Sequence, residues 1–130
     1  MSKTKSATTL ELVALGGSIQ ERRRGREAVT QSEVAIRLNS DAAVEKCLRG
    51  LDLSDQRLAD VPQMYDWVMV WKETEKGKPG ATVRFGVAWY DEAYFQEKKD
   101  IYLGADHLAM FAGFGAGSAD VEVKHYVLAA

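Results

Sequence analysis

At residues 64–90 the chain reads MYDWVMVWKETEKGKPGATVRFGVAWY, which is the most regular hydrophobic pattern in the protein. Two arms of alternating residues flank a segment, ETEKGKPGA, that contains Gly77, Pro79 and Gly80. Alternation with a period of two places every second side chain on the same face of a strand. Glycine and proline interrupt strands and are typical of turns. The pattern therefore predicts a long antiparallel hairpin.

The three tryptophans of the protein all belong to this predicted hairpin. Trp67 and Trp71 lie in its first arm and Trp89 lies in its second arm. Unbroken alternation along both arms assigns the three indoles to one face. Because large aromatic side chains dominate core burial, we predict that this face is a wall of the core and not a platform for a ligand.

The flanking segments predict further strands and a helix. Three of them alternate like strands, namely residues 10–15, 30–38 and 119–128. Between Ser40, a preferred helix N-cap, and Gly50, a preferred helix terminator, an apolar stripe predicts an amphipathic helix at about 41–50. One or two short helices are expected as well, beginning near residues 54 and 106. We therefore predict an α+β fold, mainly an antiparallel sheet of about five to six strands with these helices packed on it.

Residues 91–104, DEAYFQEKKDIYLG, are compatible with a second hairpin or with a helix. Tyr94, Phe95, Ile101 and Tyr102 belong to the residue types that strands favour. Strands are therefore the preferred interpretation of this segment.

Length and composition indicate one globular domain. The chain has 130 residues, a net charge of -2 and 46% hydrophobic residues, which is sufficient for a core without disulfides or metals. Residues 1–8 are predicted to be a flexible N-terminal arm and residues 9–130 a single domain. The small net charge argues against binding nucleic acid through overall charge, although a local basic patch remains open.

The same totals favour a cytoplasmic protein without a cofactor. Cys47 is the only cysteine, which fits a reducing compartment. The sequence has neither a secretory signal nor an apolar run of membrane-spanning length, so we expect no membrane association. One cysteine and two histidines do not suit a structural zinc site. We therefore expect neither a metal nor a cofactor.

A cluster of arginines is the first candidate binding site: Arg22, Arg23, Arg24 and Arg26. If residues 10–15 and 30–38 pair as a hairpin, these guanidinium groups occupy its tip. In that position they can contact the phosphates of a nucleic acid or an acidic protein surface. The alternative is a solvated turn whose charge is partly offset by Glu21 and Glu27.

Catalytic constellations are sparse, and we assign no catalytic residue. His107 follows Asp106 at a predicted helix start and is a candidate general base. His125 shares a strand face with several valines, where a hydrogen-bonded core histidine is the default. An enzyme with a pocket at one of these histidines stays an open alternative.

The preferred hypothesis is a non-enzymatic structural protein that self-associates through its sheet, because exposed sheet edges pair readily. The expected N-terminal hairpin, meander and helix make the general plan similar to that of small viral coat proteins. In this hypothesis the partner is a second copy of the chain, and the arginine tip contacts nucleic acid or an acidic partner. The alternatives are a small regulator or inhibitor that docks on a larger protein, and a pocket enzyme that uses His107 or His125.

Overall fold

The computed structural model describes residues 8–14, 27–58, 65–111 and 120–128. Its elements in chain order are β1 (Thr8–Ala14), β2 (Thr30–Leu38), α2 (Asp41–Leu58), β3 (Tyr65–Glu75), β4 (Ala81–Trp89), α3 (Glu92–Tyr102), α4 (Ala105–Phe111) and β5 (Asp120–Val127). The strands form one five-stranded antiparallel sheet in the order β1-β3-β4-β2-β5. The predicted α+β class is confirmed.

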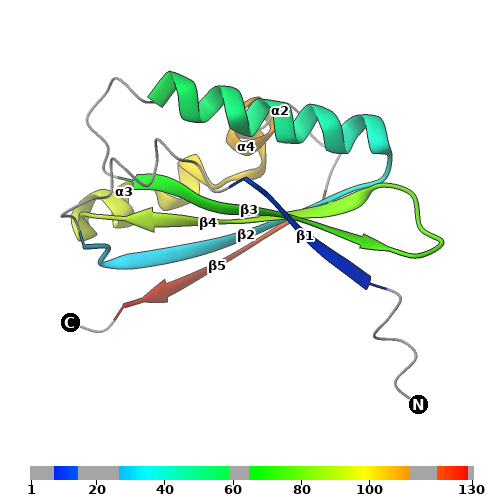
Figure 1. Cartoon of the computed structure of the whole chain (residues 1–130). Helices are drawn as coiled ribbons and strands as arrows, with labels where there is room; N and C mark the ends of the chain where they lie inside the picture. Colours follow the sequence, from blue (N-terminus) through cyan, green and yellow to red (C-terminus); the bar gives the residue numbers. More distant parts are fainter. Residues whose placement is uncertain (1–7, 15–26, 59–64, 112–119, 129–130) are drawn as a thin grey trace, which may run out of the picture.

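The helices all lie on one face of the sheet (Figure 1). The core lies between the helices and the sheet. Its largest fully buried side chains include Ile36 and Leu38 of β2, Val83, Val87 and Trp89 of β4, and Leu108 of α4. The opposite face carries no helix in the described part of the chain. We call it the open face and the other the covered face. This two-layer arrangement explains why β2 alternates between buried and accessible residues along its whole length.

The predicted central hairpin is confirmed, but one irregularity changes what its first arm presents. The pairing of β3 with β4 shifts register between Val68 and Trp71, and Met69 in this interval has a φ of 34°. A bulge of this kind inserts a residue and turns the following side chains to the other face. Tyr65 pairs with Trp89 on the covered face, whereas Trp71 pairs with Arg84 on the open face.

The prediction that all three tryptophans lie on one face is therefore wrong. Trp89 is completely buried in the core, and Trp71 lines the opposite side of the sheet. The side chain of Trp67 lies outside the described residues. Alternation predicts the face of a residue only while the ladder is regular, and the bulge at Met69 interrupts it.

The predicted hairpin between the first two strands does not form. β1 pairs with β3 at one edge of the sheet, and β2 lies between β4 and β5. Pairing with β4 runs without interruption from Thr30 opposite Trp89 to Leu38 opposite Ala81. Because β2 is buried on the covered face and has a neighbour on both sides, it matches the equally buried β4 better than the exposed β1.

Helix α2 begins as predicted and ends later than predicted. The Ser40 hydroxyl accepts a hydrogen bond from the Ala43 N–H at 3.1 Å, which is an N-cap contact. The helix passes through Gly50 and continues to Leu58, so the separate short helix predicted near residue 54 is its second half. Glycine inside a helix costs about 1 kcal/mol. Burial of Val44, Cys47 and Leu51 against the sheet outweighs this cost.

Most of residues 91–104 belongs to helix α3 (Glu92–Tyr102), so the preference for strands in this segment is wrong. The Asp91 carboxylate accepts a hydrogen bond from the Tyr94 N–H at 2.9 Å and caps α3. Phe95 is the buried anchor of this helix and packs edge-on against Trp89. Aromatic residues favour strands only where they lie on a pleated surface. Here the capping aspartate and the packing of Phe95 against Trp89 stabilise the helix.

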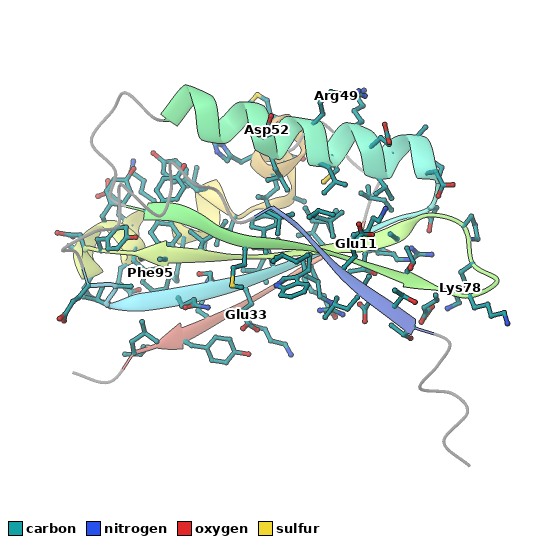
Figure 2. All side chains as sticks on the ribbon, in the orientation of Figure 1. Glu11, Glu33, Arg49, Asp52, Lys78 and Phe95 are labelled. Carbon is teal, nitrogen blue, oxygen red and sulfur yellow. The ribbon has the colours of Figure 1, made fainter. Side chains whose placement is uncertain are left out.

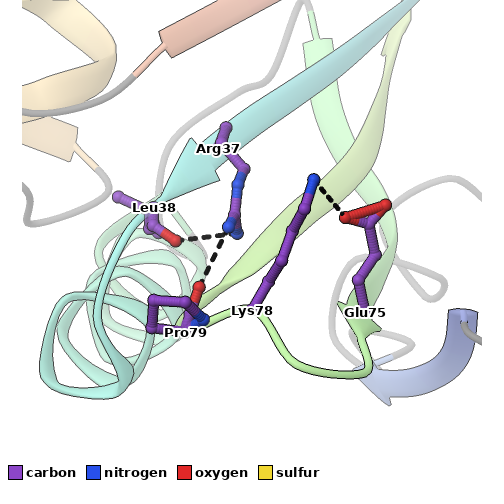
Figure 3. Close-up of polar contacts among 5 residues, drawn as sticks. All are labelled: Arg37, Leu38, Glu75, Lys78 and Pro79. Atoms are coloured by element: carbon purple, nitrogen blue, oxygen red, sulfur yellow. Dashed lines mark hydrogen bonds and ion pairs between the residues drawn. The ribbon is translucent and has the colours of Figure 1, made fainter.

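The turn between β3 and β4 is attached to the junction between β2 and α2. The Arg37 guanidinium donates hydrogen bonds to the carbonyl oxygens of Leu38 and Pro79, both at 2.9 Å (Figure 3). Gly80 has a φ of 75°, and a Cβ at this position would collide with the Leu38 carbonyl oxygen. Only glycine combines this backbone conformation with so close an approach.

Candidate functional site

The sequence-predicted arginine cluster, Arg22, Arg23, Arg24 and Arg26, lies outside the described residues. Its role therefore stays a prediction. The structure bears on this prediction in one respect, because the hairpin that was to carry these arginines at its tip is absent. The candidate sites among the described residues are the two histidines, the open face and the edges of the sheet.

His125 terminates a chain of hydrogen bonds that starts in the core. The Trp89 indole N–H donates to Ser32 Oγ at 2.9 Å, and Ser32 Oγ lies 2.7 Å from His125 Nδ1. With the indole as donor, the serine hydroxyl completes the chain by donating to the neutral imidazole. Burial lowers the pKa of His125, and the positive charge of Lys99 lowers it further, whereas Asp100 opposes both effects. The imidazole is therefore neutral at neutral pH.

A serine beside a histidine suggests a nucleophile, but the burial of this serine excludes that role. Ser32 has no exposed surface, so a substrate has no route to its hydroxyl. The neighbouring Thr30, equally buried, donates its hydroxyl to a Glu92 carboxylate oxygen at 3.2 Å. Both buried hydroxyls thus have hydrogen-bond partners, and their role is structural.

His107 belongs to the aromatic packing between α3 and α4. Its ring stacks on Tyr102 with the centroids 5.1 Å apart, and burial lowers its pKa. The Tyr94 hydroxyl donates to the Tyr102 hydroxyl at 3.0 Å in the same cluster. Tyr65 stacks on Trp89 at 5.2 Å and joins this cluster to the core. The predicted candidate bases, His107 and His125, thus contribute to the packing of α3 and α4.

Cys47 is also a packing residue. Its side chain is fully buried, and burial raises the pKa of its thiol to about 12. A protonated thiol without solvent access is neither a nucleophile nor a metal ligand. Among the described residues no group of three or more His, Cys, Asp or Glu side chains is placed to hold a metal ion.

The open face contains a shallow depression of about 340 Å³ in the middle of the sheet. Small residues, Ala35 and Gly86, lie in its lining where larger side chains would fill it. Its other lining residues are Gln31, Glu33, Val34, Met69, Trp71, Arg84, Phe85, Glu122 and Lys124. Glu33 projects from the side of the sheet that faces away from α2 (Figure 2).

Acidic groups predominate on this face. The Arg84 guanidinium donates to the Glu73 carboxylate at 2.8 Å, so one of the cations on the open face already has an anionic partner. Glu33 and Glu122 are exposed carboxylates beside the exposed Lys124. A surface with this balance does not attract the phosphate backbone of a nucleic acid. The nucleic-acid contact of the arginine cluster stays a prediction.

The two edges of the sheet differ in regularity. β1 has a register shift between Leu12 and Ala14, and irregular edges resist pairing with another chain. β5 pairs with β2 without a shift, from Asp120 opposite Arg37 to Val127 opposite Thr30. Its end exposes large apolar side chains: Tyr126 is 45% exposed and Val127 is 79% exposed. β5 is therefore the edge better suited to pair with a strand of another chain.

The backbone groups of β5 can be assigned to its two sides. The Leu128 N–H bonds the Val29 carbonyl oxygen at 3.1 Å across the β2 side of the sheet. In an antiparallel ladder the residues of a strand alternate between bonding one neighbour and bonding the other. Even-numbered residues of β5 thus bond β2. The N–H and C=O groups of Val121, Val123 and His125 point away from β2, and no described strand lies there.

Comparison with protein-family models, with curated proteins and with solved structures found no match. No helix in the described ranges is long and apolar enough to cross a membrane. The proposed function therefore depends on the geometry of the sheet. Sequence reasoning missed two features, the position of Trp71 on the open face and the edge of β5 that has no described neighbour. Neither has a local signal, because one depends on a bulge and the other on strand order.

Proposed function

We propose that the protein is a non-enzymatic structural subunit that self-associates through its β-sheet. The observation that carries the proposal is the edge of β5, a regular strand that has one neighbour among the described strands and main-chain groups that point outward. Such an edge is a template for another strand, and natural proteins usually protect it with a bulge, a proline or a cover. Asp120–Val127 contains no proline and pairs with β2 without a bulge, and no described segment covers its outer side, so the charged side chains of this strand are its only such protection among the described residues.

The side chains of β5 support pairing. Its covered-face positions are Val121, Val123, His125 and Val127, which are compatible with a strand that continues inside a larger sheet. Charged residues are confined to the open-face positions, where they stay solvated after pairing. The edge is therefore suited to a permanent neighbour.

A regulator or inhibitor that docks on a larger protein is the second candidate. The same edge favours it, because an extended segment of another protein can add to a sheet edge through main-chain hydrogen bonds. In either case we propose a cytoplasmic protein, since its single cysteine is buried and unpaired with another thiol. Contact of the arginine cluster with nucleic acid or an acidic surface is a separate proposal.

Size-exclusion chromatography with light scattering, with absorbance read at 260 and 280 nm, tests this function. We expect a defined oligomer that persists at micromolar concentration. A monomer at high concentration would overturn self-association and favour the docking protein. A raised 260/280 ratio would show bound nucleic acid and support the separate proposal for the arginines, whereas a ratio typical of protein would count against it.

A matched pair of variants connects the oligomer to the edge. Val123→Pro removes an outward N–H, which an edge strand tolerates because that group does not bond its neighbour. We expect this variant to keep its circular dichroism spectrum and to become a monomer. Leu10→Ser on β1 is the control, and we expect it to keep the oligomer. Dissociation by the control alone would place the contact at the opposite edge.

A further inference from the structure

We infer that β5 pairs antiparallel with β5 of a second copy in one register, in which Val123 lies opposite Val123 of the copy. This inference rests on the proposed self-association and specifies its geometry. It requires a twofold axis perpendicular to the sheet near Val123, so that the helices of both copies cover the same face of the combined sheet.

The direction of the backbone groups restricts the registers. The outward N–H and C=O groups belong to odd-numbered residues of β5, as the bond from Leu128 to Val29 shows. In an antiparallel pair, residues that exchange two hydrogen bonds lie directly opposite each other. An odd residue must therefore oppose an odd residue of the copy. Three central registers satisfy this condition, and they place Glu122, Val123 or Lys124 on the axis.

Charge distinguishes the three registers. With Glu122 on the axis two carboxylates oppose each other, although Asp120 of each copy then lies opposite Lys124 of the other. With Lys124 on the axis two ammonium groups oppose each other. Like charges directly opposite destabilise a strand pair. With Val123 on the axis, Glu122 of each copy lies opposite Lys124 of the other. Opposite charges meet twice, and no like charges meet.

The ladder geometry strengthens these two contacts. Even-numbered residues point their main-chain groups toward β2, so Glu122 and Lys124 of the copy form a non-hydrogen-bonded pair. Side chains approach each other most closely at such pairs. Both residues are exposed, and neither engages in an ion pair with a described residue. The charges are therefore available to a second copy without loss of an existing contact.

The neighbouring row continues the same alternation of charge. Within one copy Lys124 lies opposite Glu33 of β2. In the dimer Lys124 would then lie between Glu33 of its own chain and Glu122 of the second chain. On the covered face Val121 would oppose His125 of the second chain, and the two Val123 side chains would meet at the axis. The combined sheet would have β1 as its only kind of edge among the described strands.

Charge exchange tests the partner and its register together. Glu122→Lys and Lys124→Glu each place like charges opposite each other, and we expect each to raise the dimer dissociation constant about tenfold. An equimolar mixture of the two variants restores both opposite-charge contacts in the heterodimer. We expect the mixture to dimerise as tightly as the wild-type chain. Equal weakness of the mixture would overturn the inferred register.

Cysteine pairing gives an independent readout of register. Opposed Cα atoms at a non-hydrogen-bonded pair are about 4.5 Å apart, within disulfide range. We expect a disulfide dimer from a mixture of Glu122→Cys and Lys124→Cys, but from neither variant alone. A dimer from Glu122→Cys alone would place Glu122 on the axis, and one from Lys124→Cys alone would place Lys124 there. The buried Cys47, with its raised thiol pKa of about 12, does not compete.

The outcomes separate the inference from the function on which it rests. A wild-type chain that stays monomeric overturns both. A wild-type oligomer with no disulfide in the mixture, and with no effect of either charge reversal, overturns the β5 register and leaves self-association in place. In that case the contact lies elsewhere on the molecule, and Leu10→Ser on β1 and Trp71→Ala in the middle of the sheet test two further surfaces.

Discussion

Alternate residues of β2 enter two different environments. Val34, Ile36 and Leu38 are almost completely buried under the helices, whereas Glu33 and Ala35 face the side that no described helix covers. The same strands therefore hold the fold together on one face and present charged, accessible groups on the other. This division implies that substitutions on the covered face change stability, and that substitutions on the open face and the β5 edge change association.

The largest effect is expected at the centre of the covered face. Trp89→Ala removes a fully buried indole that packs on Tyr65 and Phe95 and donates to Ser32. We expect a loss of about 3–5 kcal/mol in the free energy of unfolding, measured by urea denaturation. Trp71→Ala on the open face is the control, with a loss below about 1.5 kcal/mol. Similar losses for the two variants would contradict the view that the covered face contributes more to stability than the open face.

The next largest effect is expected where the turn between β3 and β4 meets the junction between β2 and α2. Gly80→Ala adds a Cβ at a φ of 75° and into the backbone of Leu38. We expect a loss of about 2–4 kcal/mol in unfolding free energy, from strain and from overpacking. Gly77→Ala has a φ of 83° but meets no atom within 4 Å. It should cost only about 1 kcal/mol, so equal losses would argue against the close approach at Gly80.

A smaller effect is expected from the hydrogen-bond chain. Ser32→Ala leaves the Trp89 indole N–H buried without its acceptor. Such a group costs about 1–3 kcal/mol. Gln31→Ala, one position along β2 and on the open face, should change the free energy of unfolding by less than about 0.5 kcal/mol. Chemical denaturation of both variants measures the difference. Equal changes in the free energy of unfolding would show that the hydrogen bonds through Ser32 add no stability.

The smallest effect is a dependence on pH. The pKa values of His107 and His125 lie below their ordinary value of 6.5 in the folded chain, so below this pH the unfolded chain binds more protons. We expect stability to be constant above about pH 7 and to fall as pH decreases through about 6.5 toward the folded-state values. Denaturation between pH 5.5 and 7.5 measures this fall. His125→Gln should reduce the slope, and an unchanged slope would remove His125 as its source.

Much of the fold was predictable because its signals are local. Period-two alternation identified the strands from residues 30–38 and the hairpin of residues 64–90, since each side chain of a regular strand reports its own face. Ser40 identified the start of α2 for a similarly local reason, namely that an N-cap acts within one turn. Where a local signal was misleading, as for the aromatic residues of α3, the capping aspartate and tertiary packing decided otherwise.

The candidate site was much less predictable than the fold. The arginine cluster was prominent in the sequence because charge is visible residue by residue, whereas the edge of β5 became recognisable only once the strand order was known. Glu122 and Lys124 look unremarkable in sequence, because alternation of charges is common on solvated strands. Their relation to a second copy depends on which backbone groups face outward, and that depends on the neighbour of β5.

The sequence by itself determined the α+β class, the strand periodicity and the burial of Trp89, because hydrophobic pattern acts over a few residues. Only the tertiary structure decided that β1 and β2 lie apart, that Trp71 turns to the open face, and that β5 forms an edge. Strand order depends on contacts between residues distant in sequence, whose combined burial no local pattern encodes. The bulge at Met69 has the same origin, since a methionine with positive φ carries no signal in the sequence.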